Sequence, residues 1–228
     1  MPQYQYVKAE PKKRRVKKLG LLPWSLMAAG SFIILWTIWP IASFVFLQQP
    51  LLGVTISPLS QKSSVVLGES LDYTDPNTWF PTKPQKKMVA PVNSYQISIP
   101  KLNIVNATVI IAGDDLKKSL IHYGGTGLPG QYGTAVIFGH STLPQFFNPK
   151  DYATIFSTLP TLEIDDEILV TYDGITYRYV IFDMTITKPN DLSPLEQRFD
   201  DSYITLITCV PPGTYWQRLN VKAKLKKI

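Results

Sequence analysis

One cysteine, Cys209, is the residue of this 228-residue chain best suited to covalent chemistry. It ends an apolar, β-branched run that begins at Thr205, and the turn Pro211-Pro212-Gly213 follows. A free cysteine is often only a small buried hydrophobe. A lone thiol cannot form an intramolecular disulfide, however, and the end of a strand before a tight turn is a good position for a nucleophile. This context favours a functional thiol.

Histidine and arginine could supply the partners that such a thiol needs. Of the two histidines, His140 ends a strand-like run over 134–139, whereas His122 lies in a Gly-rich loop that could sit near the same site. We favour His140 as the acid and base, with His122 as its competitor. Arg218 is the only arginine after Cys209, and a turn over 211–215 would bring it back beside the thiol. A guanidinium there can donate to a developing oxyanion or to substrate carbonyls, which predicts acyl transfer through a thioester.

The sequence gives little support for a nucleotide-binding site or a metal site. Residues 125–130 match the nucleotide-binding pattern G-x-G-x-x-G, but Pro129 and the strand-like run from Thr134 leave no room for the helix that this motif requires. Two histidines and one cysteine have no metal-ligand spacing, and the acidic group at 163–167 is better interpreted as a solvated turn than as a calcium loop. We therefore expect neither a cofactor nor a metal ion.

The elements that position these residues are short strands. Residues 94–228 consist of β-type runs separated by turns, and Asp173-Gly174 between two of them is a strong hairpin signal. Two stretches, 117–122 and 153–159, could each form a short helix. The expected strands are 95–99, 107–112, 134–139, 167–172, 175–186, 203–209 and 216–225. They predict an all-β fold in the form of a closed or nearly closed β-barrel.

A basic segment and a long apolar stretch precede the strands. Residues 1–18 hold seven Lys or Arg and one Glu, which equals the whole net charge of +6. The rest of the chain is neutral and lacks the basic face of a nucleic-acid-binding domain. No charged residue lies between 19 and 61, and a helix over 21–47 would be about 40 Å long, against a hydrocarbon core of about 30 Å. The apolar run is too long for a signal peptide, and no convincing Ala-x-Ala cleavage site follows it.

These features divide the chain into four segments. Residues 1–20 form a basic tail, which the positive-inside rule places in the cytoplasm, and 21–47 form a single transmembrane anchor. Residues 48–93 contain six prolines and read as a semi-rigid linker. The catalytic domain, 94–228, is then expected outside the cell membrane.

The motifs around the cysteine and the histidine resemble those of sortases. Residues 205–209, the following Pro-x-Gly-Thr and the run 218–221 are similar to the family's signature, as is Pro129-Gly130 leading to Gly139-His140. Residues 95–100 resemble the opening strand of that domain. The Pro-x-Gly-Thr is most similar to class D. The chain departs from the family at Ser141, where an arginine often stands, and at Thr134, where an asparagine often stands.

The resemblance implies an eight-stranded β-barrel with short helices and a membrane-anchored cysteine transpeptidase. Such enzymes cleave a motif similar to Leu-Pro-x-Thr-Gly in surface proteins that carry a C-terminal sorting signal. They transfer the acyl group to an amine of a cell-wall precursor or a pilin. Carried over to this chain, Cys209 is the nucleophile, His140 the general acid and base, and Arg218 the stabiliser of the oxyanion or substrate. Three further residues are expected to bind substrate: Thr208, His122 and Thr214. The loop 188–202 matches the region that lines the Leu-Pro end of the groove.

Two other functions remain open from the residues. One is an envelope cysteine peptidase or amidase whose thioester passes to water. A papain-like arrangement would place cysteine before histidine in the chain, but here His140 precedes Cys209. The other is a non-catalytic, membrane-tethered β-barrel for binding or assembly, which predicts no reactive thiol.

Overall fold

The structure is a computed structural model that describes residues 21–54, 72–88 and 90–226. The described chain forms two compact units, divided between Thr37 and Ile38. The expected cytoplasmic tail and the part of the expected linker over 55–71 lie outside the described residues.

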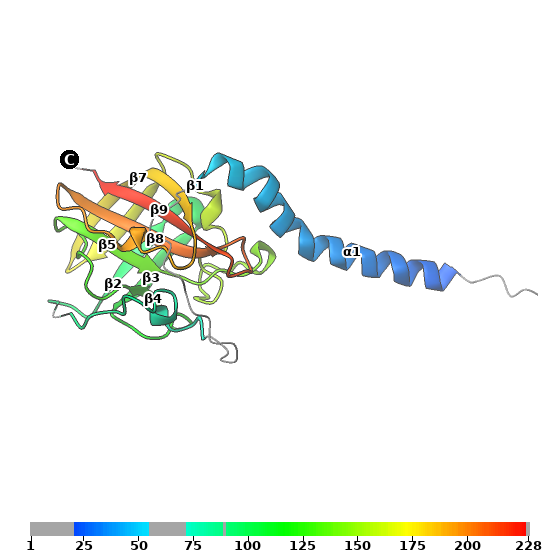
Figure 1. Ribbon diagram of the computed structural model, residues 1–228, viewed down its shortest axis with the longest axis horizontal. Helices are drawn as coiled ribbons and strands as arrows, with labels where there is room; N and C mark the ends of the chain where they lie inside the picture. Colours follow the sequence, from blue (N-terminus) through cyan, green and yellow to red (C-terminus); the bar gives the residue numbers. More distant parts are fainter. Residues whose placement is uncertain (1–20, 55–71, 89, 227–228) are drawn as a thin grey trace, which may run out of the picture. The chain divides into compact units, whose positions relative to one another are not determined.

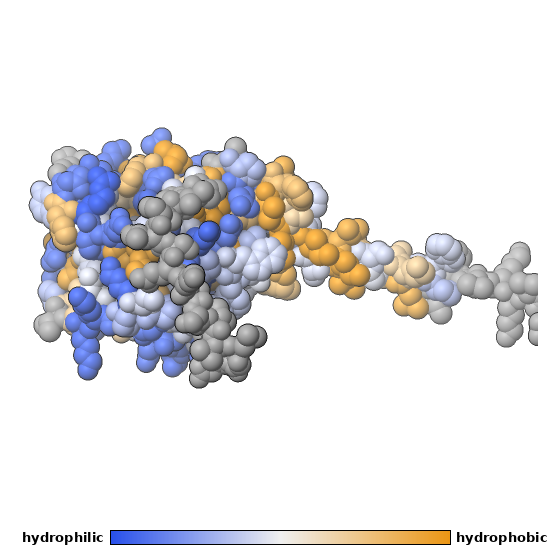
Figure 2. All heavy atoms as spheres, in the orientation of Figure 1, coloured by the Kyte–Doolittle hydropathy of each residue, from blue (hydrophilic) through white to orange (hydrophobic). Residues whose placement is uncertain are grey.

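The apolar stretch forms one long helix, α1 (Leu21–Ser43), drawn in blue in Figure 1. A π-helical turn, η1 (Phe44–Gln48), and a 3₁₀ turn, η2 (Gln49–Leu51), extend it. Hydrophobic side chains run along its exposed surface in Figure 2. The span Pro23–Gln48 has 26 residues and is, by length and composition, the one helix of the described chain able to cross a membrane.

Eight strands close into a barrel, as predicted (Figure 1). Their order around the barrel is β7-β6-β2-β3-β4-β5-β8-β9, and antiparallel pairing of β7 with β9 closes the circle. The strands are β2 (Ser94–Ile99), β3 (Ile104–Ile111), β4 (Leu120–His122), β5 (Gly133–Phe138), β6 (Glu167–Tyr172), β7 (Ile175–Thr187), β8 (Ser202–Val210) and β9 (Gln217–Leu225). A ninth, two-residue strand, β1 (Gly53–Val54), lies outside this circle and pairs in parallel with β7.

Local sequence accounts for several of these elements. Asp173 and Gly174 both adopt positive φ, 50° and 75°, which gives the tight turn expected between β6 and β7. Strand β8 is buried along its whole length, because other parts of the structure cover both of its faces. Alternate side chains of β8 therefore enter two different clusters: Ile204 and Leu206 pack into the barrel core, and Ile207 and Cys209 pack into a second cluster with Trp79 and Phe80.

Two predicted helices are wrong. Residues 120–122 form β4, which pairs with β3 and β5 and is buried at every position. Tertiary pairing with two neighbours outweighs the weak local preference of so short a stretch. Residues 153–158 form successive turns. The 3₁₀ helix η6 (Leu159–Thr161) follows them and contains Pro160, which cannot donate the hydrogen bond that an α-helix would need.

Parts of the expected linker are packed structure. Trp79 and Phe80 are buried in the second cluster, and Phe44, from the end of the expected anchor, is buried in the barrel core. Proline keeps these stretches out of regular elements, but it does not prevent large apolar side chains from being buried. A domain starting at Ser94 would lose the aromatic side chains that cover the outer face of β5 and β8, so the packed unit extends further toward the N-terminus.

Candidate active site

The hairpin of β8 and β9 places Arg218 directly opposite Cys209 in the strand register. The connecting turn is held by Thr214, whose backbone N–H and hydroxyl both donate to the carbonyl of Pro211. Gly213 takes a φ of 83° there, which a glycine adopts without strain. The guanidinium Nη1 of Arg218 lies 3.4 Å from Cys209 Sγ. The cation is thus held beside the thiol by backbone pairing.

His140 reaches the same end of the barrel from β5. Strand β5 runs parallel to β8, and the N–H of Gly139 donates to the carbonyl of Ile207. A Cβ at position 139 would clash with Phe156 and Leu120, so only glycine fits before the histidine. One residue further, Ser141 Oγ donates to the carbonyl of Cys209 at 2.7 Å. These bonds hold the histidine segment against the cysteine strand.

Residues 72–80, here called the cover segment, lie over this site. The ring of Trp79 stacks on the guanidinium of Arg218, with 4.7 Å from Cζ to the ring centroid, and its centroid lies 6.3 Å from that of His140. Trp79 Nε1 donates to the carbonyl of Tyr73, and the Tyr73 ring stacks on Tyr215 at 4.2 Å. Cys209 and Arg218 are each only 1% exposed, and His140 is 8% exposed. The cover segment thus helps to shield the thiol from solvent.

Burial sets the protonation of the covered site. It raises the pKa of the Cys209 thiol to about 11, although the neighbouring Arg218 opposes the shift. Burial also lowers the pKa of His140, and the charge of Lys117 acts in the same direction. Near neutral pH both groups are therefore uncharged while the cover segment is in place. Hydration of the thiol would favour the thiolate, which is the nucleophile.

The three residues predicted to bind substrate each make hydrogen bonds within the protein. Thr208 is fully buried, and its hydroxyl donates to the carbonyl of Gly139, so it braces the histidine segment. Thr214 stabilises the turn after Cys209 and remains partly exposed there. His122 is fully buried, with Nδ1 2.9 Å from the Tyr95 hydroxyl and Nε2 3.1 Å from Thr126 Oγ1. Both ring nitrogens of His122 are thus engaged within the barrel, where burial lowers its pKa to about 4, and it does not reach the thiol.

Other residues of the site were missed by sequence reasoning. Trp79 and Tyr73 lie in the stretch read as linker, where aromatic side chains near a capped Asp75-Pro76 turn were the available signal. Ser141 was noted only as a departure from the family pattern, yet it bonds the cysteine backbone. The loop 188–202 contributes Leu192 and Leu195 to the apolar cluster that contains Cys209. Within the described parts of the chain, no three His, Cys, Asp or Glu side chains gather as a metal site would require.

Comparison with known proteins identifies the family. The model of the sortase domain matches residues 97–226, more than half of the chain. The chain belongs to the sortase family. A search of the curated proteins found no match.

Solved sortase structures share the barrel. A Clostridium perfringens sortase D5 transpeptidase is 26% identical, with a TM-score of 0.51, and the match covers 62% of this chain and 83% of that one. Sortase C-1 of Actinomyces oris is 30% identical, with a TM-score of 0.52 and coverage of 61% and 76%. Sortase C1 of Streptococcus agalactiae is 28% identical, with a TM-score of 0.52 and coverage of 62% and 72%. Family membership implies a cysteine transpeptidase, and sortases act on surface proteins with sorting signals and on pilins.

Removing the indole of Trp79 should expose the thiol of this sortase. We expect Trp79→Ala to react with a methanethiosulfonate reagent at least tenfold faster at pH 7.5, because hydration lowers the pKa of Cys209 from about 11 toward its usual value near 8.5. The measurement is the rate of mass increase of the folded protein. Phe182→Ala, which removes an exposed aromatic ring from β7, is the control and should react like the wild type. Equal rates for wild type and Trp79→Ala would show that the cover segment does not limit access.

Proposed function

We propose that this chain is a membrane-anchored sortase that cleaves a Leu-Pro-x-Thr-Gly-like motif and transfers the acyl group to an amine. The observation that carries the proposal is the convergence of three side chains at one end of the barrel: Cys209 and Arg218 face each other across β8 and β9, and the His140 segment is bonded to the cysteine strand. The Pro-x-Gly-Thr turn and the likeness to sortase D5 support a class D type.

The geometry supports a two-step acyl transfer. Once the cover segment moves aside, His140 takes the thiol proton, and Sγ attacks the carbonyl carbon of the motif threonine. The negative charge that develops on the carbonyl oxygen is stabilised by the guanidinium of Arg218, which cannot lose its proton. His140 then returns the proton to the leaving glycine amine, and a thioester remains. An incoming amine attacks that thioester and restores the thiol.

Unpaired polar atoms at the site support these roles. Nε2 of His140 and Nε of Arg218 are buried and have no hydrogen-bond partner. Such atoms are rare in folded proteins and are costly unless a ligand satisfies them. A substrate carbonyl and a leaving amine would supply the missing partners.

The proposed location follows from the apolar span. One membrane crossing over Pro23–Gln48, with the basic residues 1–18 in the cytoplasm, puts the catalytic domain on the outer surface. Surface proteins with a C-terminal sorting signal and amine-bearing envelope precursors or pilins would meet it there. The neutral body of the chain fits no nucleic-acid partner.

The test measures what fraction of the thioester is resolved by an amine and what fraction by water. The full chain, in detergent or vesicles, is incubated with a Leu-Pro-x-Thr-Gly peptide library, with and without glycine-type or diamino-acid amines. Ligated and hydrolysed products are measured by mass. We expect ligated product to dominate when an amine fits, because a positioned nucleophile has a high effective molarity.

Hydrolysis alone across the amine panel would contradict a transferase and support the envelope peptidase or amidase. Absence of both products, with an unreactive thiol even in Trp79→Ala, would support the non-catalytic barrel.

A further inference from the structure

The end of the apolar span is part of the catalytic unit. Phe44 lies in the barrel core and is only 1% exposed, and Val45 and Leu52 pack against the same core. One residue after Leu52, Gly53 pairs with Thr185 of β7. Residues 44–53 are therefore fixed to the barrel, and they include the last residues of the candidate membrane span.

This end of the span lies beside the loops that follow the catalytic residues. A cavity of about 60 Å³ is lined by Phe44 and Gln48, by Pro144 from the loop after His140, and by Pro212 from the turn after Cys209. A Cβ at Gly213 would lie 3.2 Å from Leu143 Cγ, so the turn and the loop also pack against each other. Both catalytic loops thus lie at the same end of the molecule as the exit of the span.

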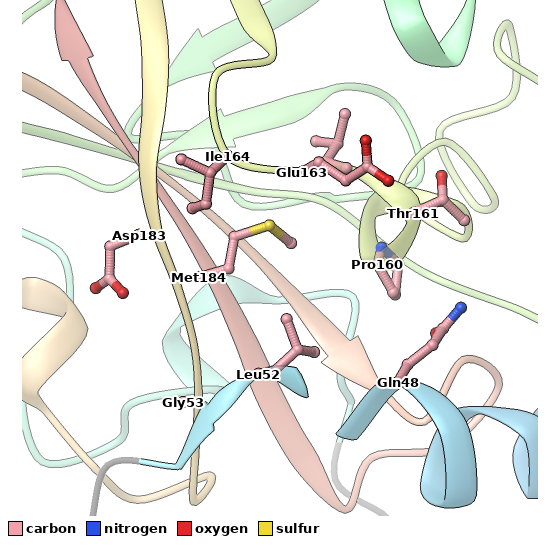
Figure 3. A pocket seen from close by; sticks show the side chains of 10 residues that line it. Gln48, Leu52, Gly53, Pro160, Thr161, Glu163, Ile164, Asp183 and Met184 are labelled. Atoms are coloured by element: carbon pink, nitrogen blue, oxygen red, sulfur yellow. The ribbon is translucent and has the colours of Figure 1, made fainter. Parts of the chain in front are cut away.

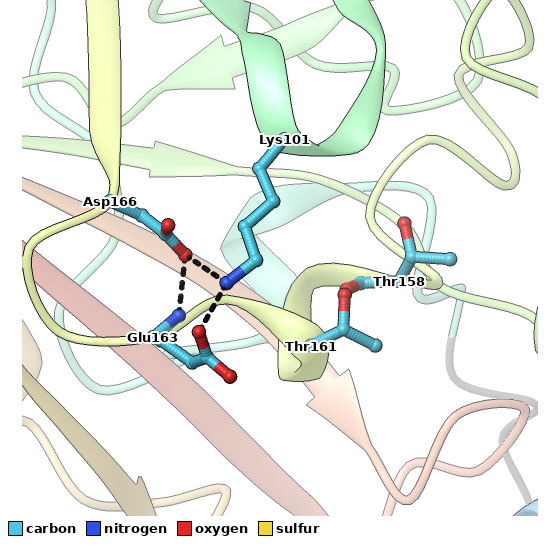
Figure 4. Close-up of polar contacts among 5 residues, drawn as sticks. All are labelled: Lys101, Thr158, Thr161, Glu163 and Asp166. Atoms are coloured by element: carbon cyan, nitrogen blue, oxygen red, sulfur yellow. Dashed lines mark hydrogen bonds and ion pairs between the residues drawn. The ribbon is translucent and has the colours of Figure 1, made fainter.

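The loop 158–166 forms a braced surface beside this exit. Lys101 pairs with Glu163 at 2.6 Å and with Asp166 at 2.9 Å, as Figure 4 shows. A second, open cavity of about 620 Å³ separates Gln48 and Leu52 from this loop (Figure 3). Glu163 and Asp183 are the charged residues that line this second cavity.

The catalytic loops and the exit of the span contain no charged residue of their own and carry exposed aromatic rings. No Asp, Glu, Lys or Arg occurs in residues 38–53, 141–149 or 210–217. Phe46 is 76% exposed and Phe146 is 64% exposed, and Leu47 and Trp216 are exposed as well. A soluble surface normally mixes charged side chains into such loops, whereas uncharged loops with aromatic rings are typical of the lipid–water interface.

We propose that the loop 143–147, together with the adjacent turn 211–213, rests on the lipid bilayer, with Phe146 inserted at the headgroup level. We call this surface the membrane face. The catalytic thiol then works at the bilayer surface and is not held away from it by a spacer. The inference rests on the membrane anchoring proposed above, and its occupant is the lipid surface itself. Continuity with the apolar span argues for lipid, because the candidate span runs directly into residues 44–48, which pack beside this face.

Single fluorophores on the full chain test the proposal. Cys209→Ala removes the only cysteine, and one new cysteine is then introduced as Phe146→Cys, Phe46→Cys or Ile175→Cys. Each is labelled with a nitrobenzoxadiazole fluorophore, and the protein is reconstituted in phosphatidylcholine–phosphatidylglycerol vesicles with or without doxyl-labelled lipid. Ile175 is an exposed control because it starts β7, roughly 30 Å along the strand from the point where Gly53 pairs.

We expect doxyl lipid to quench the labels at 46 and 146 at least twofold and to leave the label at 175 unchanged. Quenching at 46 but not at 146 would overturn the membrane face and leave the anchor intact. Absence of quenching at 46 would overturn the anchor as well. Protection of the label at 146 from aqueous iodide without lipid quenching would indicate contact with a second copy of the chain, which also contradicts the proposal.

Discussion

Replacing Cys209 with alanine abolishes both cleavage of the motif peptide and transfer to an amine. The loss should be on the order of 10⁶-fold in kcat, the scale seen when a covalent nucleophile is removed. The chain has no second cysteine that could take over. Because Cys209 is a small side chain in an apolar cluster, alanine should leave the fold intact. Product formation by mass spectrometry and trapping of the acyl-enzyme measure the effect.

His122→Gln is the informative companion to that variant. His122 is fully buried in the barrel, and both of its ring nitrogens are engaged. We therefore expect this change to lower the melting temperature, while the folded fraction still forms the thioester. Turnover by Cys209→Ala would reveal another nucleophile. Loss of acylation in folded His122→Gln would mean that the choice of His140 as the acid and base is wrong.

Changing Arg218 to lysine should lower kcat/KM by about 10²–10³, although the positive charge is kept. The guanidinium Nη1 contacts Cys209 Sγ, and it also lies 3.2 Å from the carbonyl of Tyr215. Its plane stacks on Trp79. A lysine ammonium is a compact point charge that cannot reproduce this planar set of contacts and still reach an oxyanion. The measurement is steady-state cleavage and transfer, with thiol alkylation to check that the site still folds.

Arg178→Lys is the matched control for this change. Arg178 on β7 is exposed and pairs with Glu167 at 3.1 Å, so its replacement should change kcat/KM by less than twofold. An Arg218→Lys enzyme within a few-fold of wild type would show that Arg218 supplies only general positive charge.

Features that depend on neighbouring residues in the chain could be predicted from the sequence. Alternation of apolar residues and the Asp173-Gly174 turn predicted the β6–β7 hairpin, because a two-residue turn of positive φ sets the register locally. The same logic placed Arg218 near Cys209, since a short turn joins their strands. The uncharged, apolar stretch 21–47 predicted one long helix, because its own length and composition are sufficient for that prediction.

Features that depend on pairing between distant strands could not be predicted from the sequence and became visible in the folded structure. The parallel alignment of β5 with β8 brings the His140 segment to the cysteine across about seventy residues, and no local signal encodes which strands become neighbours. The fold also places the two histidines in different environments, because the strand Leu120–His122 directs His122 into the barrel. The cover by Trp79 was hidden in a Pro-rich stretch for a related reason. Burial of an aromatic ring depends on the apolar surface that folding presents to it, and here that surface is the outer face of β5 and β8.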